Sequence, residues 1–192
     1  MFAIAAPAAA GAAPANNVCV SVNGNTPVQR GSAQCTTTTG GNVAIARGDG
    51  ATATATDGSP NRAISTGTGS EAYAFEGTGN VAIATNGSTA VAFQGDYNRA
   101  TARDNSEANA SFGTRNSAVS SNGSVAVASN GTRNFATARD GSTAYAQIGS
   151  HNTATATNGG SAAAVHGNYN TATATSHCTV FITDVDNTTE RC

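Results

Sequence analysis

The chain has 192 residues, a formal net charge of −2, and only 10% charged residues. Alanine occurs 40 times, while leucine, lysine and tryptophan are absent and aromatic residues make up 5%. This composition excludes a conventional core of large aliphatic and aromatic side chains, and the sparse charge excludes an extended basic surface for nucleic acid or for an anionic membrane.

Residues 1–15 are small and apolar and end in Ala13-Pro14-Ala15, a pattern that signal peptidase accepts. We interpret this segment as a signal-peptide remnant, although the basic region of a signal is missing and the first charged residue is Arg30. The alternative is a disordered Ala/Pro tail. The segment is too short to span a bilayer, so we expect an exported protein without a membrane span.

Four cysteines flank the remaining sequence: Cys19, Cys35, Cys178 and Cys192. Four cysteines permit three pairings. If the residues between them form a rod, only Cys19–Cys35 and Cys178–Cys192 come within disulfide reach, about 4.4–6.8 Å between Cα atoms. Two disulfides agree with a secreted or cell-surface location, and free thiols are the alternative. Residues 16–41 and 177–192 are therefore predicted as disulfide-stapled caps.

A repeat fills residues 42–176. An Asn followed by x-Ala-x-(Ala/Ser) recurs at steps of 18 or 19 residues, and each unit carries a second x-Ala-x-Ala stretch. The repeated asparagines are Asn42, Asn61, Asn80, Asn98, Asn116, Asn134, Asn152 and Asn170. Between the two stretches lie a Gly-x-x-Asn turn and a second turn of Asn or Asp, Gly or Asn, and Ser or Gly, residue types that tolerate the positive φ of tight turns.

Alternation with period two, broken by turns every 8 or 10 residues, indicates strands. Each unit is therefore predicted to be one coil of strand, turn, strand and turn. The fold class that follows is all-β: a single-chain β-solenoid, or two-sheet β-roll, of about eight coils with an Ala-lined core.

The alanines are expected to face inward, because the alternate positions carry charged residues such as Arg99 and Glu107 that cannot be buried unpaired. The alternative places Thr, Val, Ile and aromatic side chains inside and the Ala face outward. The stacked asparagines predict a ladder of side-chain amides parallel to the rod. The alternative is that Asn is only a suitable turn residue.

The stretches Gly41-Asn42-Val43-Ala44-Ile45-Ala46 and Gly79-Asn80-Val81-Ala82-Ile83-Ala84 resemble the N-S-V-A-I-G type repeats in the heads of trimeric autotransporter adhesins. The resemblance covers the repeat region and implies a β-roll that forms trimers and binds host matrix at a cell surface. The glycine that ends the family motif is alanine here, and the unit lengths differ. No binding residue is carried over.

No catalytic or metal site is predicted, and no cofactor is expected. His151, His166 and His177 are interpreted as solvent-exposed turn residues. The glutamates are scattered over different coils, whereas glycoside hydrolysis needs paired carboxylates, and the GGxGxD motif of calcium-binding β-rolls is absent. The sequence thus predicts a protein that is not an enzyme.

Function is expected on the outward positions. Apolar side chains are predicted to gather on both faces as a candidate interface, which suggests contact with a second subunit, such as in a trimer, or with a surface or matrix ligand. Its residues are Ile45, Ile64 and Ile83 on one face and Tyr73, Phe75, Val91 and Phe93 on the other.

We therefore predict a non-enzymatic exported structural or surface-interaction protein of adhesin-like type that does not bind nucleic acid. One alternative is an ice-binding solenoid, suggested by Thr-x-Thr rows such as Thr153/Thr155 and Thr171/Thr173. The other is a degenerate polysaccharide-binding β-helix.

Overall fold

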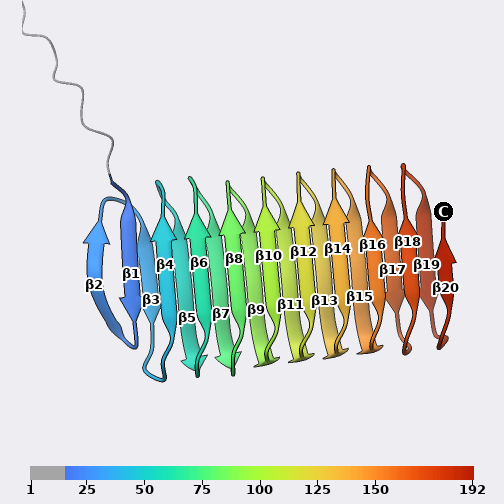
Figure 1. Ribbon diagram of the computed structural model, residues 1–192, viewed down its shortest axis with the longest axis horizontal. Coiled ribbons are helices and arrows are strands. Elements are labelled where there is room, and N and C mark those ends of the chain that lie inside the picture. Colours follow the sequence, from blue (N-terminus) through green and yellow to red (C-terminus); the bar gives the residue numbers. More distant parts are fainter. Residues whose placement is uncertain (1–15) are drawn as a thin grey trace, which may run out of the picture.

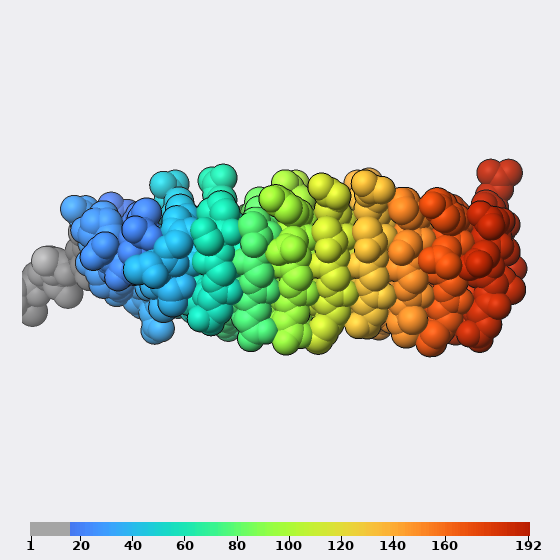
Figure 2. Space-filling model, turned by 90° about the horizontal axis from the view of Figure 1, so that it is seen from below, coloured from blue at the N-terminus to red at the C-terminus, as the bar shows by residue number. Residues whose placement is uncertain are grey.

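The computed structural model describes residues 16–192, and the predicted signal segment, residues 1–15, lies outside this range. The described chain is all-β, with twenty strands and no helix. It forms an elongated rod in which two sheets face each other along the whole length (Figures 1 and 2). The predicted β-solenoid is confirmed.

From β3 onward the strands alternate between the two sheets, and β1 and β2 both belong to sheet A. Sheet A contains β1 (Val18–Val22), β2 (Asn25–Arg30), β4 (Val43–Arg47), β6 (Arg62–Thr66), β8 (Val81–Thr85), β10 (Arg99–Arg103), β12 (Ser117–Ser121), β14 (Phe135–Arg139), β16 (Thr153–Ala156), β18 (Thr171–Ala174) and β20 (Thr189–Arg191). Sheet B contains β3 (Gln34–Thr37), β5 (Thr52–Gly58), β7 (Glu71–Gly77), β9 (Thr89–Asp96), β11 (Glu107–Thr114), β13 (Val125–Thr132), β15 (Thr143–Ser150), β17 (Ser161–Val165) and β19 (Thr179–Thr183).

From β3 onward, each strand pairs in parallel with the strand two places later, so each coil contributes one strand to each sheet. The solenoid has about nine coils, one more than predicted. The difference arises at the ends, because β3 lies in the predicted N-terminal cap and β19 and β20 lie in the predicted C-terminal cap. The two caps are thus partly built from coils that continue the ladder.

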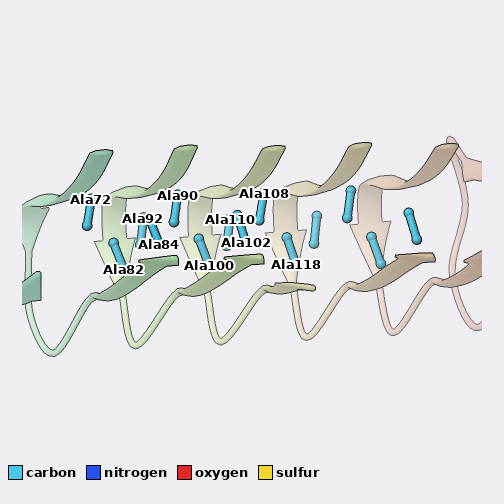
Figure 3. Packing of buried hydrophobic residues seen from close by; sticks show 14 of the residues in the cluster. Ala72, Ala82, Ala84, Ala90, Ala92, Ala100, Ala102, Ala108, Ala110 and Ala118 are labelled. Carbon is cyan, nitrogen blue, oxygen red and sulfur yellow. The ribbon is translucent and has the colours of Figure 1, made fainter. Parts of the chain in front are cut away.

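The core is a seam of alanine methyl groups between the sheets, as Figure 3 shows for ten labelled alanines. Ala82, Ala90, Ala100 and their equivalents in the other coils are fully buried, which confirms the inward orientation of the Ala columns. Because a methyl group is short, the two backbones lie close together and the rod is thin.

Valine and isoleucine face the seam only in β19, at the C-terminal end, whereas Cys35 and Thr37 take inward positions in β3 at the N-terminal end. Val180 and Ile182 on β19 pair in register with Ala162 and Ala164 and are almost fully buried. They fit there because no further coil follows on that side of sheet B. This substitution of Val and Ile for Ala also explains why the sequence pattern missed the last coil.

One turn of each coil contains the repeated asparagines, all buried. In the middle of the rod, Asn116 Oδ1 accepts a hydrogen bond from the backbone N–H of Asn134 at 3.0 Å, and Asn116 Nδ2 donates to the carbonyls of Ser111 and Gly131, both at 3.1 Å. The ladder therefore links side chains to backbone groups rather than one side-chain amide to the next. Each Asn satisfies turn groups that would otherwise be buried without partners.

The other turn has a second ladder that the sequence pattern did not reveal. Its first two residues, such as Asn122 and Gly123, both have positive φ, as in a type I′ turn. The serine that follows is buried, and Ser106 Oγ accepts the backbone N–H of Ser124 at 3.1 Å. Side-chain-to-backbone hydrogen bonds therefore flank the Ala seam on both edges, from asparagines at one turn and from serines at the other.

At the N-terminal end, β1 runs antiparallel to β4, and β2 folds back antiparallel on β1. The Cys19–Cys35 disulfide, with Cα atoms 5.6 Å apart, joins β1 of sheet A to β3 of sheet B. Pro27 in β2 offers no N–H at the outer edge of sheet A, which discourages pairing with another strand.

At the C-terminal end, the second disulfide joins Cys178, just before β19, to Cys192, just after β20, with Cα atoms 6.2 Å apart. Both pairings agree with the prediction.

Replacing Ser120 with Ala is expected to stabilise the protein. Ser120 occupies an inward Ala position, is fully buried, and its hydroxyl has no hydrogen-bond partner. A buried hydroxyl without a partner costs about 1–3 kcal/mol, so Ser120→Ala should raise the midpoint of urea unfolding. Ser65 is the matched control, because its hydroxyl donates to the Ser70 carbonyl at 2.6 Å and Ser65→Ala should lower the midpoint. A lower midpoint for Ser120→Ala would contradict this account of the seam.

Candidate functional site: the outer faces of the rod

Residues 16–192 enclose no pocket. Within the same range, no three His, Cys, Asp or Glu side chains gather in a way that could hold a metal ion. No membrane-spanning helix is found in the described chain. The side chains that point away from the seam are the ones that a partner molecule meets first, and they form the candidate site.

The predicted interface residues come together as two patches on opposite faces. Ile45, Ile64 and Ile83 lie side by side in register on β4, β6 and β8 of sheet A, and we call them the isoleucine patch. All three are half-buried. They form a short apolar row across three neighbouring strands.

The second patch lies on sheet B. Tyr73 pairs with Val91, and the rings of Phe75 and Phe93 stack with their centroids 5.2 Å apart. Phe112, which the sequence places near these residues, extends the patch: its ring meets Phe93 edge-on with the centroids 4.9 Å apart and is 46% exposed. We call these five residues the aromatic patch.

Charge is segregated between the two faces. On the strands of the repeat in sheet A, from β4 to β18, the charged outward side chains are all arginines: Arg47, Arg62, Arg99, Arg103 and Arg139. On the strands of sheet B, from β5 to β17, the charged side chains are all acidic: Asp57, Glu71, Glu76, Asp96 and Glu107. The isoleucine patch is therefore flanked by positive charge and the aromatic patch by negative charge.

Glu71 also acts on its neighbour in the aromatic patch. The Tyr73 hydroxyl donates to the Glu71 carboxylate at 3.3 Å. Partial burial raises the pKa of Tyr73 above its ordinary value, and the negative charge of Glu71 raises it further. Tyr73 consequently remains a neutral hydrogen-bond donor at physiological pH.

The Thr-x-Thr rows do not form one continuous surface. Thr52, Thr54 and Thr56 lie on β5 of sheet B near the N-terminal end, whereas the rows of β16 and β18 lie on sheet A near the C-terminal end. The two rows on sheet A end at once on either side, because Phe135 pairs with Thr153 and Arg191 pairs with Thr173. The hydroxyl rows therefore cover only a few coils on each face.

A further column was not recognised in the sequence, although aligning the units on the repeated Asn would have revealed it. The position directly before this Asn carries Tyr97, Arg115, Arg133, His151 and Tyr169 in successive coils. We call this column the ridge. His151 had been expected to be solvent-exposed, but it is half-buried and stacked on Tyr169 with ring centroids 4.7 Å apart.

No protein-family model, no curated protein and no solved structure matches this chain.

Proposed function

We propose that the protein is a non-enzymatic, exported structural rod that acts through contacts of its outer faces, first of all with further copies of itself. The two disulfides support an oxidising, extracellular environment. The outward-facing apolar and charged columns support a surface-interaction role of adhesin-like type.

The observation that carries this proposal is the complementarity of the two patches. The isoleucine patch has Arg62 beside Ile64 on the same strand, and the aromatic patch has Glu71 beside Tyr73. Contact between face A of one copy and face B of the next buries both patches and brings arginine toward glutamate. Contact between two identical faces would bring like charges together, so a heterologous interface is favoured.

Cross-linking between single-cysteine variants tests this arrangement. Ile64→Cys and Val91→Cys, each with the native disulfides intact, are mixed with a short bis-maleimide. The mixture should yield a covalent dimer that neither variant yields alone, because a heterologous contact joins one site of each kind. Thr155→Cys with Thr143→Cys, on sheets A and B away from the patches, is the control pair and should give markedly less product.

Two results would overturn the proposed self-association: a particle that is monomeric by light scattering at high concentration, or cross-linking within Ile64→Cys alone. The surface-interaction role as a whole fails if the monomer also binds nothing on matrix and glycan arrays.

A further inference from the structure

The ridge is a row of cationic and aromatic side chains, one in each of five successive coils, and three of its four neighbouring pairs are in contact. The Arg115 guanidinium carbon lies 5.8 Å from the centroid of the Tyr97 ring. Further along the ridge, a guanidinium nitrogen of Arg133 is 3.3 Å from Nε2 of His151. The His151 ring stacks in turn on the ring of Tyr169. Tyr97 and Tyr169, at the two ends, are 56% and 58% exposed.

The backbone holds these side chains in a fixed row. The N–H of Arg115 donates to the Asp96 carbonyl of the preceding coil, and the N–H of Arg133 donates to the Thr114 carbonyl, both at 2.9 Å. The same bond recurs at the other ridge positions. Since stacked strands lie about 4.8 Å apart, the five side chains extend over roughly 19 Å parallel to the rod axis.

The local backbone does not favour these residue types. Tyr97, Arg115, Arg133, His151 and Tyr169 all have φ between 58° and 61°, the left-handed region that glycine and asparagine adopt most readily. The same position is Gly79 one coil earlier and Asn187 in the last coil. Large aromatic and cationic residues thus occupy a backbone conformation that they adopt unfavourably. Such residues are found where the side chain itself serves a function.

The two ridge arginines form no ion pair with any described carboxylate. The carboxylate of Asp96, the residue directly before Tyr97, accepts the backbone N–H of Thr78 at 2.9 Å. Arg133 makes one contact, to His151, and Arg115 lies over the Tyr97 ring, so each planar guanidinium group keeps N–H donors that can bind an external carboxylate or sulfate.

We propose that the ridge binds a linear anionic polysaccharide, of uronic acid or sulfated sugar units, lying along the rod axis. Arg115 and Arg133 bind the acidic groups, while the exposed rings of Tyr97 and Tyr169 lie against the apolar faces of sugar rings. This inference rests on the proposed surface-interaction role and names a partner for it.

Charge density favours such a polysaccharide over nucleic acid. Nucleic-acid binding gains its affinity from many neutralised phosphates, whereas the ridge offers two guanidinium groups on a chain with a net charge of −2. An acidic polysaccharide presents apolar sugar-ring faces beside its acidic groups, which suits two adjacent cations flanked by aromatic side chains. An open row without a pocket also suits an extended polymer better than a small molecule.

The test measures binding of the full chain to polygalacturonate, dextran sulfate, neutral dextran and single-stranded poly-dT by calorimetry. The ridge variant is Arg115→Asn with Arg133→Asn, because Asn occupies the same backbone position in the last coil. The control is Arg99→Ser with Arg139→Ser, which removes the same amount of charge from sheet A. Serine is already present at the equivalent positions of the neighbouring coil, as Ser117 beside Arg99 and as Ser121 beside Arg139.

We expect binding to at least one of the two acidic polysaccharides, and which one binds identifies uronate or sulfate as the recognised group. The ridge variant should lose at least tenfold in affinity and the control less than threefold, with unchanged melting temperatures. Equal losses in both variants, equal binding of neutral dextran, tighter binding of poly-dT, or no binding to either acidic polymer would overturn the proposal. If the chain self-associates yet binds no acidic polymer, the ridge proposal fails while the proposed function stands.

Discussion

Replacing Ala126 with Asp is expected to disrupt the middle of the rod. Ala126 lies in β13 with Ala108 and Ala144 as its in-register neighbours, and all three are fully buried. The seam has neither room for a carboxylate nor a cation to pair with it. An unpaired buried charge costs several kcal/mol. This is a large share of the free energy of unfolding of an ordinary domain, which is about 5–15 kcal/mol.

The adjacent Val127 offers a matched control, because it lies on the same strand but points outward and is only half-buried. Val127→Asp should change the melting temperature by a few degrees at most, whereas Ala126→Asp should lower it strongly or split the transition. Since each coil contacts only its neighbours, hydrogen exchange should show the loss of protection centred on β11, β13 and β15. Equal melting temperatures for the two variants would refute the Ala seam.

Replacing Gly113 with Ala is expected to have the second large effect. Gly113 has φ of 142°, and a Cβ atom there would lie 1.9 Å from the carbonyl oxygen of Gly131 in the next coil. Because the obstacle is backbone, relief requires the two coils to separate at this turn. Strain of this kind together with the unfavourable φ should cost about 3 kcal/mol or more.

Gly123 separates the steric effect from the conformational one. It also has positive φ, at 70°, but a Cβ atom there would meet nothing within 4 Å. Gly123→Ala should therefore cost only about 1–2 kcal/mol, the price of a left-handed conformation for alanine. Urea unfolding of both variants measures the difference, and similar losses would show that close approach of the coils does not dictate glycine at this turn.

Several features of the fold could be predicted because every repeat unit carries the same evidence for them. Arg99 and Glu107 at positions alternating with Ala indicate which face is buried, and the same alternation in every unit leaves one architecture that buries all the methyl groups. The disulfide pairing follows once the repeat is a rod, since Cys19 and Cys178 are then too far apart to combine.

Other features depend on atoms that no spacing reveals. Asn116 could pair through its amide with another amide or with the backbone, and only the turn geometry directs its Oδ1 to the Asn134 N–H. The last coil was missed because β19 buries Val180 and Ile182 in place of alanines. The ridge column could have been found by aligning the units on the repeated Asn, whereas the hydrogen bonds that join the turn serines follow only from the atomic positions.

The sequence by itself determined the period of the rod, the methyl-lined interior and the sealed ends, because these follow from which residue types can be buried together at each repeated position. The repeat also assigned the isoleucines and the aromatic residues to opposite faces, whereas only the tertiary structure decided which turn side chains contact one another from coil to coil. Stacking brings residues 18 or 19 places apart to within one strand spacing, and this proximity creates the contacts between ridge side chains.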